Sequence, residues 1–313
     1  MQNKKTYFKT ILKGMISLAL VYFVFSLINV SLVIESFRSM QMQTFTTVAS
    51  IYAGYMFIGA FKWKLLLPEH SYKSILRFTY VGQFYGFVLP GQITGELAKG
   101  YRFAREGGEG ARITASILVD KITAFGALVI MGIFGCLFAA HRPPLFAVMI
   151  IVAFAFVLLG FFYAARFRNF FTGVLRILRI PESFLMKIDL FLSHYNSFSK
   201  SYRIIILSTI MGIISQGVAI LMNMIIAQSI GVQIGLFDWF WLFAITSFVT
   251  LLPITIGGLG IRETVFAASA LSLNVRPSLT VAVSLMMYGF QVIYACIGGM
   301  IELLSFIKKK KHE

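Results

Sequence analysis

The sequence predicts an all-α polytopic membrane protein: about six full transmembrane helices plus two re-entrant helical hairpins, arranged as inverted-topology repeats. The composition is the first reason, because 58% of the 313 residues are apolar and only 13% are charged. The second is length, since each long uncharged run exceeds the roughly 20 residues that a helix needs to cross the hydrocarbon core. The third is a pair of shorter runs, each interrupted by a Leu-Pro step and glycines. The long runs are 14–34, 39–61, 143–165, 204–237, 239–261 and 277–301.

The placement of charge sets the orientation. The net charge is +16, and 23 of the 28 lysines and arginines fall in the connections 4–13, 62–77, 99–112, 166–203 and 308–311. Basic connections stay on the cytoplasmic side of a membrane. We therefore predict a multi-pass protein of the cytoplasmic (inner) membrane with both termini in the cytoplasm. Because the basic residues collect in short connections between apolar runs, the net charge does not indicate a nucleic-acid partner.

Other residue types exclude several classes of site. Cys136 and Cys296 fall in apolar runs, so neither a disulfide framework nor a thiolate metal site is predicted. The four histidines are scattered, without a second ligand at metal-binding spacing. We therefore expect no metal and no cofactor.

The first half of the chain, residues 1–140, contains three predicted spans and one re-entrant element. The spans are 11–34, 42–61 and 112–139. The apolar run 75–89 lies between two basic connections, so it starts and finishes inside and must turn back within the membrane. Gly82 and Gly86 would let this element pack closely against a neighbour.

The second half, residues 141–313, repeats this order from the opposite side, and the two halves form a single membrane domain, 1–313. Residues 167–200 mix apolar and basic positions at helical spacing, which predicts interfacial amphipathic helices on the cytoplasmic side. Trp239 and Trp241 are placed like an interfacial aromatic belt. An alternative count makes 240–257 a full span and 261–275 a short one. The remaining elements are spans at 145–165, within 204–230 and at 277–301, with the second re-entrant element starting at 240–252.

Two stretches, residues 89–102 (LPGQITGELAKGYR) and 252–263 (LPITIGGLGIRE), combine helix-breaking residues with charges. Proline removes a backbone donor and glycine relaxes the dihedral limits, so a helix is expected to end in each stretch. One such stretch alone would suit an interfacial loop. A matched pair favours a transporter substrate site formed by discontinuous helices. The helix-breaking residues are Pro90, Gly91, Gly95, Pro253, Gly257, Gly258 and Gly260, and the charges are Glu96, Lys99, Arg102, Arg262 and Glu263.

Asp120 and Lys121 place two more charges inside the predicted span 112–139. Charges at this depth line a cavity or pair with each other, because an exposed charge in hydrocarbon is costly. Asp120 could line a cavity, or it could pair with Arg102 or Lys99 and lock two helices together. In the fifth span, Gln216 and Asn223 are seven residues apart and share a helix face.

At these same residues the chain resembles the lysylphosphatidylglycerol synthase transmembrane region, a family also described as flippase-like integral membrane proteins. The matching blocks are GELAKGYR (95–102), RITASILVDKITAFG (112–126) and LPITIGGLGIRE (252–263). Lys121 stands where arginine is commoner in the family. In fused members a soluble C-terminal domain transfers the aminoacyl group, and we expect that domain to be absent here.

The resemblance and the charges together imply a flippase that moves a phospholipid, glycolipid or polyprenyl-phosphate-type lipid between leaflets. Its partners would be a lipid with a charged head group and a coupling ion, since no P-loop for ATP is found. The alternatives are a membrane enzyme acting on a lipid phosphate and a non-catalytic partner in envelope lipid synthesis; no catalytic motif supports the enzyme. The predicted substrate-binding residues are Glu96, Lys99, Arg102, Asp120, Lys121, Arg262 and Glu263.

Overall fold

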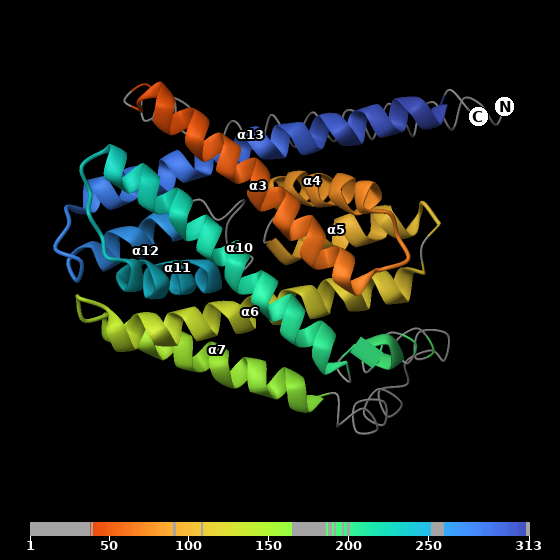
Figure 1. Ribbon diagram of the computed structural model, residues 1–313, viewed down its shortest axis with the longest axis horizontal. Helices are drawn as coiled ribbons and strands as arrows, with labels where there is room; N and C mark the ends of the chain where they lie inside the picture. The colour runs from red at the N-terminus through yellow and green to blue at the C-terminus, as the bar shows by residue number, and fades with distance from the viewer. Residues whose placement is uncertain are drawn as a thin grey trace.

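The computed structural model describes residues 40–89, 92–107, 109–164, 201–251 and 260–310, together with residue 38 and isolated positions between 186 and 198. Within these ranges the chain folds into helices joined by short connections, and no strand occurs (Figure 1). The helices are α3 (Met42–Leu66), α4 (Tyr72–Val88), α5 (Gln92–Ala104), α6 (Gly110–Phe138), α7 (Leu145–Ala164), α10 (Tyr202–Ser229), α11 (Leu236–Thr250), α12 (Ile261–Ala270) and α13 (Pro277–Lys310).

Among the residues that the structure describes, four helices, α3, α6, α10 and α13, are long and apolar enough to cross a membrane. They coincide with predicted spans of the sequence, because an uncharged run of this length has no stable alternative in lipid. α7 forms over the predicted span at 145–165 and exposes large apolar side chains such as Phe156 and Leu159. The predicted span 11–34 and most of the predicted amphipathic segment 167–200 lie outside the described residues.

The first interrupted stretch separates two short antiparallel helices, α4 and α5, of 17 and 13 residues. Gly95 lies against Gly86, and the side chain of Lys99 lies against Gly82 one turn further along both helices. A Cβ at Gly95 would lie 2.2 Å from the backbone of Gly86, so only glycine permits this approach. The close packing expected of Gly82 is confirmed, whereas a Cβ at Gly86 would meet nothing within 4 Å, so the close approach there depends on Gly95. Pro90 and Gly91 lie outside the described residues.

The second interrupted stretch separates α11 from α12, which are 15 and 10 residues long. At about 1.5 Å per residue, neither helix as described reaches across ~30 Å of hydrocarbon. Gly260 immediately precedes α12 with φ at +83°, a left-handed conformation that glycine adopts without strain. Pro253, Gly257 and Gly258 lie in the part of the stretch that the structure does not describe.

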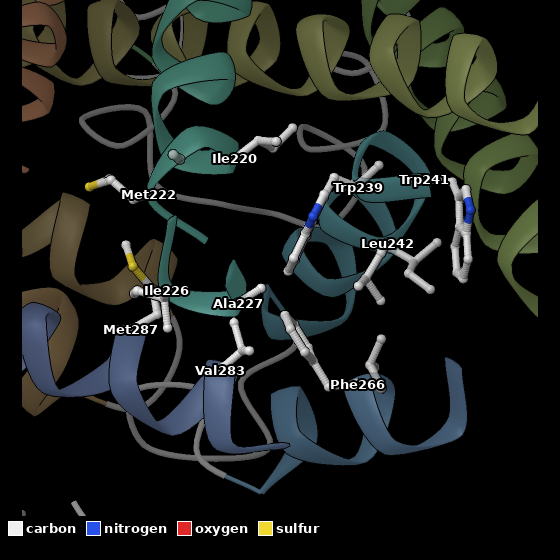
Figure 2. Close-up of a cluster of buried hydrophobic side chains, with 14 of the residues drawn as sticks. Ile220, Met222, Ile226, Ala227, Trp239, Trp241, Leu242, Phe266, Val283 and Met287 are labelled. Atoms are coloured by element: carbon white, nitrogen blue, oxygen red, sulfur yellow. The ribbon is translucent and has the colours of Figure 1, made fainter. Parts of the chain in front are cut away.

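The main hydrophobic core is formed by side chains of α3, α6, α7, α10, α11, α12 and α13. Figure 2 shows the part of it that α10, α11, α12 and α13 contribute. Trp239 and Trp241 are 1% and 0% exposed, so the predicted interfacial aromatic belt is wrong for them. The tryptophans lie in the first turns of α11, and the packing of that helix against the bundle turns them inward. Small residues again set the closest contacts, since a Cβ at Gly298 of α13 would lie 2.0 Å from the carbonyl oxygen of Tyr80 in α4.

Candidate functional site

A cavity of about 270 Å³ lies inside the bundle, and α3 to α6 and α10 to α13 all contribute to its wall. Three of the predicted substrate-binding residues line it: Glu96 from α5, Lys121 from α6 and Arg262 from α12. The two stretches singled out in the sequence therefore meet at one cavity, although they are about 160 residues apart in the chain.

The rest of the wall combines aromatic, amide and hydroxyl groups. Gln216 and Asn223 line the cavity together, which confirms that they share a helix face. The amide of Asn223 donates to the carbonyl of Ala219 in its own helix at 2.8 Å. Gln216 makes no hydrogen bond to another described residue, so its amide is available to a ligand. The remaining polar and aromatic lining residues include Tyr52, Tyr55, Gln83, Phe125, Phe243, Thr246 and Gln291.

Glu96 lies between two lysines at the edge of this cavity. Its Oε1 atom is 2.9 Å from Nζ of Lys121, and its Oε2 atom pairs with Lys99 one turn away in α5. The ammonium group of Lys99 also lies 4.1 Å from the ring centroid of Trp63 in α3, an arrangement that favours a cation. Glu96 therefore connects α5 to α6, and Lys99 is 6% exposed and does not line the cavity.

Asp120 pairs with Lys62 of α3, whose Nζ lies 2.9 Å from Asp120 Oδ1 and 2.6 Å from the Asp120 carbonyl oxygen. Of the two alternatives for Asp120, the pairing that locks two helices is present, but the predicted partner, Arg102 or Lys99, is wrong. The sequence analysis placed Lys62 only in the basic connection 62–77 on the cytoplasmic side. Because α3 extends past it to Leu66, Lys62 is a buried helical residue that is 4% exposed.

Arg102 pairs with Glu302 of α13, with 2.5 Å between Nε and Oε1. The hydroxyl of Tyr85 in α4 donates to the same carboxylate oxygen at 2.9 Å. Glu302 thus joins α4 and α5 to α13. The sequence analysis did not single out Glu302; its signal was a single acidic residue directly after the last uncharged run, 277–301, and six residues before Lys308.

Arg262 and Glu263 form a fourth group of charges, between α12 and α13. The arginine donates through Nε to Ser284 Oγ at 2.8 Å and through Nη1 to Gln291 Oε1 at 3.2 Å, and it contacts Glu263 at 3.4 Å. Glu263 accepts a hydrogen bond from Ser284 Oγ at 2.8 Å and from the backbone N–H of Gly260 at 2.7 Å. It therefore caps α12 and does not line the cavity.

Of the seven predicted substrate-binding residues, three line the cavity and four hold helices together around it. The four are Lys99, Arg102, Asp120 and Glu263. All seven lie in helices α5, α6 and α12, each of which contributes one residue to the cavity wall from this set.

An α-helical bundle with long apolar helices around a charged cavity defines a multi-pass membrane protein. The family model described as the lysylphosphatidylglycerol synthase TM region matches residues 10–299, and the chain belongs to that family. The resemblance seen in the three sequence blocks is thereby confirmed. The same comparisons find no match among curated proteins and none among solved structures.

Proposed function

We propose that this protein is a lipid flippase of the cytoplasmic membrane, which moves a lipid with a charged head group between leaflets. The observation that carries the proposal is the cavity, which places Glu96, Lys121 and Arg262 inside a bundle whose outer helices are apolar. The main barrier to lipid translocation is the transfer of a charged head group through hydrocarbon. A cavity with fixed charges and amides lowers that barrier, while the acyl chains can remain in the surrounding lipid.

The proposed architecture has six full spans and two re-entrant hairpins, with the halves 1–140 and 141–313 in inverted topology. The short antiparallel pair α4–α5 and the short helices α11 and α12 support the two hairpins. In such repeats, one half moves against the other and opens a central site to each side in turn. An ion gradient or the lipid gradient itself would drive the movement.

Transport in liposomes provides the first test. We expect purified protein to move a fluorescent phospholipid between leaflets without changing it chemically. Lys121→Gln should reduce the rate by about tenfold, because roughly 1.4 kcal/mol of head-group stabilisation corresponds to that factor. Lys73→Gln, which removes an equally positive but exposed residue in the first turn of α4, is the matched control. A new lipid product would instead indicate an enzyme, and neither transport nor product would indicate a non-catalytic partner.

Side-specific labelling tests the inverted repeat. With Cys136 and Cys296 replaced, a cysteine at Glu109 should react only from the cytoplasm and one at Asn274 only from outside. Both positions are exposed, in the connections before α6 and after α12. Labelling of both positions from the same side of intact cells would contradict the proposed topology.

A further inference from the structure

Five charged residues of α3, α5 and α6 form one continuous group, called here the lysine cluster: Lys62, Glu96, Lys99, Asp120 and Lys121. Lys62 binds Asp120, Asp120 precedes Lys121 in the chain, Lys121 binds Glu96, and Glu96 binds Lys99. Three ammonium groups therefore share two carboxylates, which leaves one positive charge in excess. An uncompensated charge inside an apolar bundle is costly unless a counter-charge is supplied.

The other buried ion pairs around the cavity do not show this excess. Arg262 has Glu263, and Arg102 has Glu302. Each of these pairs contains one cation and one anion. Arg262 also directs its donors to Ser284 and Gln291, so it holds α12 against α13 and has little capacity left for a ligand.

Within the lysine cluster, the excess charge faces the cavity through Lys121. Lys62 is 4% exposed, forms an ion pair with the Asp120 carboxylate and donates a hydrogen bond to the Asp120 carbonyl. Lys99 is 6% exposed, with Glu96 on one side and the face of the Trp63 ring on the other. The side chain of Lys121 is 30% exposed and lines the cavity, and Glu96 Oε1 is its one recorded partner among the described residues. An ammonium group has three donors, so Lys121 has donors free for a ligand.

We propose that the cavity binds one singly charged oxyanion of the phosphate class on Lys121, and that this anion neutralises the lysine cluster. Glu96 remains next to the site and disfavours a second negative charge, so a phosphodiester or a monobasic phosphate fits better than a dianion. The amide of Gln216, in the same cavity wall, is available to the oxygens of the ligand. The proposal rests on the proposed function only for the statement that a lipid carries the oxyanion.

Two substitutions in the cluster are expected to act in opposite directions. Lys121→Gln leaves two balanced pairs, Lys62 with Asp120 and Lys99 with Glu96, so the protein should fold while anion affinity falls by about tenfold or more. Glu96→Gln raises the excess to two charges, so anion affinity should rise by a similar factor. Lys121→Arg keeps the charge and should keep binding. Lys73→Gln, at an exposed position, should bind like the wild type.

Binding would be measured by calorimetry on the full-length protein in an uncharged maltoside detergent. The probes are inorganic phosphate, dihexanoylphosphatidylglycerol as an anionic phosphodiester lipid, and dihexanoylglycerol as its uncharged counterpart. Binding of phosphate and of the anionic lipid that is lost in Lys121→Gln and strengthened in Glu96→Gln supports the site. Equal affinity in wild type and Lys121→Gln, weaker binding in Glu96→Gln, or equal affinity for the uncharged lipid overturns it.

The experiments can reject the oxyanion site and the flippase function independently of each other. Binding of inorganic phosphate with the expected mutant pattern, but no binding of the anionic lipid and no transport in liposomes, would support the oxyanion site and reject the flippase. Transport that is unaffected by Lys121→Gln, together with no binding of either anion, would reject the oxyanion site and leave the flippase standing.

Discussion

Gly95→Ala is expected to destabilise the protein by about 3 kcal/mol, the upper range for forcing an extra methyl group into a packed interface. The new Cβ would lie 2.2 Å from the Cα and the amide nitrogen of Gly86 and 2.8 Å from the backbone carbon of Tyr85. Backbone atoms cannot rotate away as a side chain can, so α4 and α5 would have to separate. Their separation would also move Glu96 and Lys99, which lie on the same helix. Thermal unfolding and the monodisperse fraction in detergent would measure the loss.

The matched control is Gly59→Ala in α3, where an added Cβ meets nothing within 4 Å. Alanine in a helix interior is intrinsically more stable than glycine by roughly 0.5–1 kcal/mol, so this change should be neutral or stabilising. Glycine to alanine is therefore expected to lower the stability of the protein at Gly95 and to leave it unchanged or raise it at Gly59. Equal unfolding midpoints for the two variants would show that the contact between Gly86 and Gly95 does not hold α4 and α5 together.

Arg102→Gln is expected to cost about 3–5 kcal/mol, the range for removing one partner of a buried ion pair. It would leave Glu302, whose side chain is 6% exposed, without its cation. The hydroxyl of Tyr85 would remain as a donor to that carboxylate, but a neutral donor does not replace a charge. Adding Glu302→Gln should restore much of the lost stability, because the buried negative charge is then removed.

Arg77→Gln is the control for this pair. Arg77 and Glu106 are also ion-paired, but their side chains are 35% and 32% exposed, so the loss of stability should be within about 1 kcal/mol.

Liposome transport should also be measured for the double variant, Arg102→Gln with Glu302→Gln. Restored stability with restored transport would show that Arg102 acts only as a helix lock, whereas restored stability alone would show that the pair is also needed for movement. A double variant no more stable than Arg102→Gln would contradict the ion-pair explanation.

The sequence was sufficient to predict the helices, because their cause is local. An uncharged run such as 112–139 must satisfy its own backbone hydrogen bonds in lipid, and only a helix does so within one segment. α6 accordingly covers Gly110–Phe138. The same argument placed the end of α4 before Pro90, because proline removes a donor and restricts the residue before it.

The partners of the charges could not be predicted in the same way. If it formed an ion pair, Asp120 was expected to meet Arg102 or Lys99, yet it meets Lys62, 58 residues earlier in the chain. Sequence spacing gives the face of one helix on which a residue lies, but the facing helix depends on how the whole bundle packs. The burial of Trp239 and Trp241 was not predicted for the same reason, because it depends on which helices pack against α11.

The sequence by itself determined that the chain is a helical membrane protein of this family, with two interrupted, charged stretches. These features follow from run length, charge placement and helix-breaking residues, each of which acts within a few turns of chain. Only the tertiary structure decided that Glu96, Lys121 and Arg262 share one cavity, while Arg102, Asp120 and Glu263 hold helices together. It also decided that three lysines share two carboxylates, because a charge balance exists only once distant helices bring their side chains within a few ångströms.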